Sequence, residues 1–179
     1  HPALDGARDG FLKALEDAGY KDGENLKIEY QNAQGDQAVA QSIAESFVSD
    51  SKDLILAIAT PTAQAAYNAT KEIPVLITAV TDPIQAGLAK SLEKSETNVT
   101  GTSDATPIDK QFALIRELLP ESKKVGIVYN TSELNSEVQV AQAKVIAQKY
   151  GLELVIKGVT SVNDLAQVLD SLLKEVDVL

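Results

Sequence analysis

The chain has 179 residues, 44% of them hydrophobic and 23% charged, and this composition is typical of a folded globular protein. Its formal net charge of -10 opposes binding to nucleic acid, and no apolar run approaches the roughly 20 residues of a membrane-spanning helix. The absence of cysteine and the single histidine, His1, exclude thiolate chemistry, Cys-based metal sites and an internal His dyad.

Strand-like apolar segments alternate along the chain with segments of helical period, the pattern of an α/β protein with parallel sheets flanked by helices. Strands are predicted at 26–31, 53–59, 74–80, 98–102, 124–130 and 152–157. Helices are predicted at 3–18, 36–50, 62–72, 107–119, 135–150 and 162–174. The precision of each predicted boundary is about 3 residues.

The order of elements in the first half returns in the second half. A helix, the strand 26–31, a helix and the strand 53–59 correspond to a helix, the strand 152–157, a helix and the apolar end of the chain. The second copy also has a strand at 124–130 before its first helix. We therefore expect two lobes, 1–104 and 105–179, with a strand preceding His1 in the first and the second continuing past Leu179.

The loop after strand 53–59 has the residues of an anion site at a helix start. In parallel sheets, ligands bind beyond the carboxyl ends of the strands, where helix N-termini present free N–H groups. Thr60 suits the N-cap and Pro61 the first helical position, and free N–H groups near Thr62 and Ala63 would hold a carboxylate. An ordinary capped helix explains the same residues.

The loop after strand 74–80 offers a second set of polar groups. Thr81 can donate a hydroxyl and the Ala79 carbonyl can accept from an ammonium group. Pro83 keeps Asp82 extended at the strand end, although capping of a short helix from Ile84 is the favoured role of that aspartate. Two adjacent loops that could bind the same anion support an anion site more strongly than either loop alone.

Two further polar segments follow strands in the middle of the chain. The segment 98–104 is a predicted strand that leads into a polar corner at Asp104, and it is the expected crossover between lobes. The loop that begins at Asn130 and includes Ser132 leads to a helix capped by Asn135 or Ser136. This loop is either a polar turn or the part of a ligand cleft that the second lobe contributes.

Six segments in order resemble the tryptophan/phenylalanine-type ABC-transporter substrate-binding proteins, and the match covers essentially the whole chain. They are His1–Asp5, Ile28–Asp36, Ala57–Pro61, Thr78–Pro83, Asn98–Asp104 and Val128–Glu133. The resemblance implies a two-lobed type I periplasmic-binding-protein-like fold. It also implies an extracytoplasmic receptor that closes on an amino acid, such as tryptophan or phenylalanine, and delivers it to an ABC permease.

The same resemblance implies a location in the periplasm or, by a lipid anchor outside this sequence, on the cell surface of a Gram-positive bacterium. Thr60, Thr62 and Thr81 would hold the ligand carboxylate, and the Ala79 carbonyl the ammonium group. No catalytic residue, metal or cofactor is expected. The expected ligand-binding set is His1, Leu4, Thr60, Pro61, Thr62, Ala63, Ala79, Thr81, Asp82, Asp104, Asn130, Ser132, Asn135 and Ser136.

Two other classes of function share this fold. The effector-sensing domain of a transcriptional regulator ranks second, because it should be joined to a basic helix-turn-helix that the sequence lacks. An enzyme ranks third, because no nucleophile, base or metal set stands out and no G-x-G-x-x-G or P-loop motif follows a strand.

Overall fold

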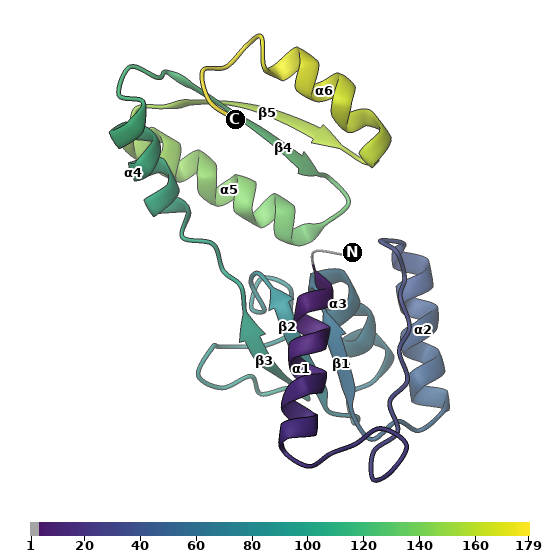
Figure 1. Cartoon of the computed structure of the whole chain (residues 1–179). Helices are drawn as coiled ribbons and strands as arrows, with labels where there is room; N and C mark the ends of the chain where they lie inside the picture. The colour runs from purple at the N-terminus through teal and green to yellow at the C-terminus, as the bar shows by residue number, and fades with distance from the viewer. Residues whose placement is uncertain (1–3) are drawn as a thin grey trace. The chain divides into compact units, whose positions relative to one another are not determined.

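The structure of the chain, a computed structural model, describes residues 4–179 and divides into two compact units, His1–Ala105 and Thr106–Leu179 (Figure 1). Each unit is built from parallel strands flanked by helices, which confirms the predicted α/β class. No helix within residues 4–179 combines the length and the apolar character needed to cross a membrane.

The first unit contains a three-stranded parallel sheet in the order β1-β2-β3. Small side chains let α3 lie close to this sheet, since its Ala63 and Ala66 share one buried cluster with Val75. A smaller alanine cluster joins α2 to α3. The elements are α1 (Asp5–Asp17), α2 (Gln37–Ser49), β1 (Ile55–Ile58), α3 (Thr60–Ala69), β2 (Val75–Val80) and β3 (Val99–Ser103).

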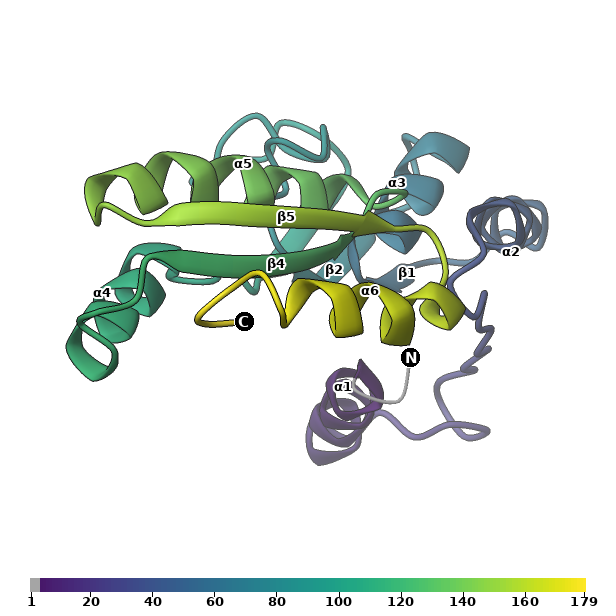
Figure 2. The same cartoon turned by 90° about the horizontal axis from the view of Figure 1, so that it is seen from above.

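The second unit pairs β4 with β5 in parallel, and Val178 adds an isolated bridge to Val125 on β4. Figures 1 and 2 show α5 and α6 on opposite faces of this strand pair. Phe112 and Val125 lie in its buried cluster. The elements are α4 (Ile108–Leu118), β4 (Lys124–Asn130), α5 (Leu134–Lys149), β5 (Glu153–Val159), the 3-10 helix η2 (Val162–Asp164) and α6 (Leu165–Leu172).

Five of the six predicted strands are confirmed as β1 to β5, and the strand predicted at 26–31 is wrong. This segment is extended but pairs with no other strand of the described chain, and its only bridge joins Leu26 to Asp22. The N–H of Ile28 donates to Asp22 Oδ1 at 2.8 Å. Without a neighbouring strand its ladder of backbone hydrogen bonds does not form.

Two predicted helices differ from the observed ones. The helix expected at 62–72 begins at Thr60 and ends at Ala69, because the Thr70 hydroxyl accepts hydrogen bonds from the N–H groups of Glu72 and Ile73, both at 3.1 Å. The helix expected at 162–174 is divided into η2 and α6. Ser161 Oγ accepts from the N–H of Asn163 at 3.2 Å and so starts the 3-10 turn.

Asp177 fastens the end of the chain to β4, and this contact depends on pH. Its Oδ2 accepts from the N–H groups of Lys123 at 2.7 Å and Lys124 at 2.9 Å, which hold the pKa of the Asp177 carboxyl below its ordinary value of 3.8. A lowered pKa contributes stability at neutral pH that is lost as the pH falls through the folded-state value.

We therefore expect Asp177→Asn to lower the free energy of unfolding at pH 7 and to reduce its change between about pH 5 and 2. Urea titrations followed by circular dichroism at several pH values measure both effects. Asp170→Asn, at an exposed position of α6, is the matched control and should keep the pH profile of the parent chain. An unchanged profile in Asp177→Asn would contradict the assignment.

Candidate functional site

The ends of three adjacent strands meet at one edge of the first sheet. Since β1, β2 and β3 run parallel, their C-terminal ends lie together, and α3 begins at the same edge. Figure 1 shows the N-terminal end of α1, which Leu4 caps, at this end of the unit. The predicted residues found at the strand ends are Thr60, Pro61, Thr62, Ala63, Ala79, Thr81, Asp82 and Asp104, whereas His1 lies outside the described residues.

Ala59 forms the turn between β1 and α3 in a strained conformation. Its φ of 82° and ψ of 155° lie in a region that almost only glycine occupies, at a cost of about 1–3 kcal/mol. Its N–H donates to the Thr78 carbonyl, and its own carbonyl accepts from the N–H of Ala63, both at 3.0 Å. Ala59 is therefore the N-cap, and the prediction that Thr60 caps the helix and Pro61 opens it is wrong.

Thr60 is 2% exposed, and its hydroxyl oxygen has no hydrogen-bond partner among the described residues. A buried hydroxyl without a partner costs about 1–3 kcal/mol, so native proteins rarely keep one without a reason. As the first residue of α3, Thr60 stands where helix N–H groups and the helix dipole favour an anion. Asn98 and Asn135 also have a buried side-chain oxygen without a partner in the described chain, but only Thr60 lies at the C-terminal ends of the first sheet.

The Thr62 hydroxyl and the Ala63 N–H already take part in hydrogen bonds within the protein. The Thr62 hydroxyl donates within the turn, where the carbonyls of Ile58 and Ala59 both lie within hydrogen-bond distance. The N–H of Ala63 is bonded to Ala59, so the prediction of a free N–H at Ala63 is wrong. With its proton committed, Thr62 does not donate to a carboxylate in this arrangement.

The second strand end exposes a different hydroxyl. Ala79 has a φ of 53°, and the β2–β3 register shifts between Ile77 and Val80, so the chain turns sharply before Thr81. The Thr81 carbonyl accepts from Ser103 Oγ at 2.9 Å, which holds the loop against β3. The half-buried Thr81 hydroxyl has no protein partner within residues 4–179 and is available to a ligand.

Asp82 has the local role that the sequence favoured. Its Oδ1 accepts from the N–H groups of Ile84 at 3.0 Å and Gln85 at 2.9 Å and so caps the turn that follows. This turn is not continued into a helix. Asp104, at the end of β3, has an exposed carboxylate, which is the charge that an ammonium group requires.

In the second unit, the loop after β4 is a closed polar turn. Asn130 Oδ1 accepts from the backbone N–H of Ser132 at 3.0 Å and from its hydroxyl at 2.7 Å, and Asn130 Nδ2 donates to Glu133 at 3.0 Å. Glu133 is the N-cap of α5, so the predicted capping by Asn135 or Ser136 is wrong. The Asn135 amide oxygen is buried without a partner in the described chain.

The titrating groups with shifted pKa values lie elsewhere. Lys52 lowers the pKa of Glu29, and Lys149 lowers the pKa of Asp109, each through a side-chain hydrogen bond. No cluster of His, Cys, Asp or Glu in residues 4–179 is arranged to hold a metal ion. The strand-end edge therefore offers hydroxyls, N–H groups and a carboxylate, which suit binding of a zwitterion.

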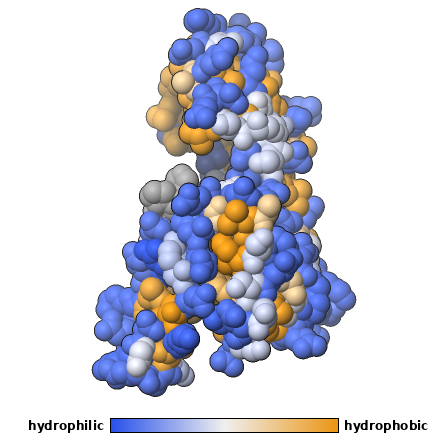
Figure 3. Space-filling view, turned by 90° about the vertical axis from the view of Figure 1, so that its right-hand side faces the viewer, coloured by the Kyte–Doolittle hydropathy of each residue, from blue (hydrophilic) through white to orange (hydrophobic). Residues whose placement is uncertain are grey.

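Two surface grooves contain none of the predicted ligand-binding residues. One runs along α2 and is lined by Gln31, Ala38, Val39, Ser42, Ile43 and Ser46. Figure 3 shows hydrophobic surface interrupted by hydrophilic side chains on the visible face of the first unit. The other groove lies between β5 and α6 and is lined by Lys157, Gly158, Val159, Thr160, Asp164, Gln167, Val168 and Ser171.

Sequence reasoning missed the positive φ angles of Ala59 and Ala79. Alanine carries no sign of a left-handed backbone, which glycine, asparagine or aspartate would have suggested. Proline two residues after Ala59 indicated a helix start but not the conformation of the cap.

Comparison with known proteins identifies close similarities over the whole chain. Residues 1–179 match the family model described as ABC transporter substrate binding protein. A protein of Clostridioides difficile (strain R20291) named "Tyrosine-binding protein" is 57% identical over 179 residues, which are 100% of this chain and 52% of that protein. The chain thus spans about half the length of this relative.

Two crystal structures are also similar. A conserved domain protein from Vibrio cholerae has a TM-score of 0.96 and 42% identity, covering 99% of this chain and 60% of that chain. A Streptococcus pneumoniae ABC domain in complex with L-Trp has a TM-score of 0.93 and 40% identity, over the same shares of both chains.

Proposed function

Because this chain belongs to the family of ABC transporter substrate-binding proteins, we propose that it binds a free aromatic amino acid for delivery to an ABC permease. The names of two relatives, one tyrosine-binding and one in complex with L-Trp, support this ligand class. The proposed role is binding without turnover outside the cytoplasm, either in the periplasm or at the cell surface through a lipid anchor outside this sequence. The family favours this role over an effector-sensing domain of a regulator.

The buried, unpartnered hydroxyl of Thr60 carries the proposal. It stands at the first position of α3, and the available Thr81 hydroxyl follows the neighbouring strand. One hydroxyl donor at a helix N-terminus and a second at the end of the neighbouring strand would match the two oxygens of a carboxylate. The amino acid's carboxylate would supply the Thr60 hydroxyl with the partner that it lacks among residues 4–179.

The ammonium group of the ligand would lie near the Ala79 carbonyl and the exposed carboxylate of Asp104, both at the same sheet edge. The second unit, through Asn130, Ser132, Asn135 and Ser136, is proposed to contact the ligand on closure. This part of the proposal rests on the family resemblance alone. Closure would then shift the population towards the state that the permease binds.

A direct titration tests this function, because the chain contains no tryptophan. The fluorescence of added L-Trp should shift to shorter wavelength and saturate as it enters a less polar site. L-Tyr should displace it, while L-Ala at the same concentration should not. Calorimetry that finds no binding of L-Trp, L-Tyr or L-Phe by the chain would contradict the proposal.

Thr81→Val is expected to weaken L-Trp binding by about 10- to 100-fold while leaving the melting temperature nearly unchanged. The variant loses a charge-assisted hydrogen bond to the carboxylate but keeps the shape and the strand propensity of the side chain. Thr100→Val, at an exposed position of β3, is the matched control and should bind as the parent does. Equal affinities of the two variants would remove Thr81 from the site.

A further inference from the structure

Five residues other than glycine have positive φ angles in the described chain, and they fall into two groups. Three of them lie in local turns or loops: Gln34 in a turn, Ser51 just after α2, and Glu96 in the loop before β3. The other two, Ala59 and Ala79, lie where β1 and β2 reach the candidate ligand site. Three of the five residues therefore lie away from the candidate ligand site, and two lie at it.

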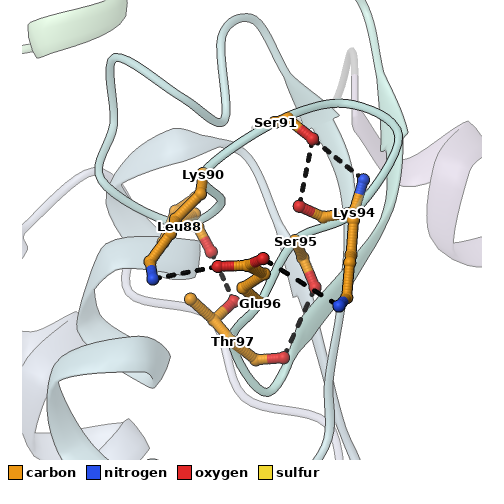
Figure 4. Close-up of polar contacts among 7 residues, drawn as sticks. All are labelled: Leu88, Lys90, Ser91, Lys94, Ser95, Glu96 and Thr97. Carbon is orange, nitrogen blue, oxygen red and sulfur yellow. Dashed lines mark hydrogen bonds and ion pairs between the residues drawn. The ribbon is translucent and has the colours of Figure 1, made fainter.

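The first group is held by local hydrogen bonds that explain its conformation. Figure 4 shows that the carboxylate of Glu96 faces Lys90 Nζ at 3.0 Å and Lys94 Nζ at 3.9 Å, in a loop closed by many polar contacts. The N–H of Gln34 donates to Asn32 Oδ1 at 2.8 Å, and that of Ser51 to the Val48 carbonyl at 3.0 Å. Such turns are common at the ends of helices and in loops.

The hydrogen bonds at Ala59 are not confined to one local turn. The backbone of Ala59 is instead held between two elements. Its N–H donates to Thr78 of β2, and its carbonyl accepts from the first turn of α3. At Ala79, the sheet register shifts by a local irregularity that leads into Thr81. Strain of this kind persists only where surrounding structure enforces it.

We propose that the strained backbones of Ala59 and Ala79 are positioning devices, which hold the Thr60 and Thr81 hydroxyls in the binding geometry before the ligand arrives. The inference rests on the proposed function for the identity of the ligand. Alanine is better suited to this task than glycine, because its Cβ closes most alternative conformations once the strained one is enforced. Preorganisation of this kind strengthens binding by lowering the ordering cost.

The test replaces each alanine by glycine, which adopts positive φ without strain but also visits other conformations. We expect Ala59→Gly and Ala79→Gly each to raise the melting temperature by about 2–6 °C. Each should also weaken L-Trp binding by about 3- to 10-fold. In Ala59→Gly, amide hydrogen exchange at Ala63, whose N–H donates to the Ala59 carbonyl, should become about fivefold faster because the first turn of α3 opens locally more often.

Ser51→Gly and Glu96→Gly are matched controls, since they relieve positive φ angles of 54° away from the site. They should raise the melting temperature without changing L-Trp affinity or the exchange of α3. If the alanine variants behave like these controls, the positioning role is wrong. If the parent chain binds no amino acid, the proposed function fails, and the exchange at Ala63 alone decides whether Ala59 positions α3.

Discussion

Replacing Gly101 by alanine should destabilise the first unit by about 3–5 kcal/mol, the largest effect expected of a single methyl group in this chain. Gly101 has a φ of +152° and faces Ile77 across the β2–β3 ladder. A Cβ at this position would lie 2.0 Å from the Ile77 carbonyl oxygen and 2.7 Å from its nitrogen. Since these are backbone atoms of a paired strand, no rotamer change relieves the clash.

Urea unfolding followed by circular dichroism measures this effect. Gly10→Ala is the matched control: it adds the same methyl group within α1, where no atom lies within 4 Å, and should leave stability unchanged or slightly raised. A Gly101→Ala protein with the unfolding midpoint of the parent would show that β2 and β3 separate easily. The clash would then not govern stability.

Arg116→Ala should destabilise the second unit by about 3 kcal/mol. The guanidinium donates to four backbone carbonyls, those of Tyr150 at 2.8 Å, Gly151 at 2.9 Å, Ser122 at 2.7 Å and Pro120 at 3.0 Å. These bonds tie the end of α4 to the turn between α5 and β5. Removal of the side chain leaves the carbonyls without their charged donor in a partly buried place.

Hydrogen exchange of the β4 and β5 amides reports this loss in the second unit directly. Arg116→Lys should recover less than half of the lost stability, because an ammonium group cannot reach four acceptors with the planar geometry of a guanidinium. Lys110→Ala, at an exposed position of the same helix, should exchange like the parent chain. Parent-like protection in Arg116→Ala would mean that the helix packing alone holds the unit together.

The sequence by itself predicted those helices, strands and caps that are decided by residues close together in the chain. The strand at 124–130 has the observed bounds, and the helix at 135–150 is displaced by a single residue, because side-chain period decides between strand and helix within a few residues. The cap at Asp82 was foreseen for the same reason, since an aspartate before proline bonds to N–H groups two and three positions ahead.

The strand predicted at 26–31 shows where local information ends. Its residues favour a strand, but a strand also needs a partner that supplies hydrogen bonds, and no segment of the described chain pairs with it. The propensity of a segment for strand structure depends on its own residues, whereas its pairing depends on whether another strand lies beside it.

The candidate site also combines features that the sequence predicts with features that it does not. Thr60, Thr81 and Asp104 follow strands in the sequence, and the parallel order of the strands is enough to predict that they share an edge. Only the tertiary structure decided that the Thr60 hydroxyl is buried without a partner among residues 4–179, that Thr62 is already bonded, and that Ala59 and Ala79 are strained. These properties arise from hydrogen bonds between β1, β2 and α3, and such contacts between separate segments override the preferences of single residues.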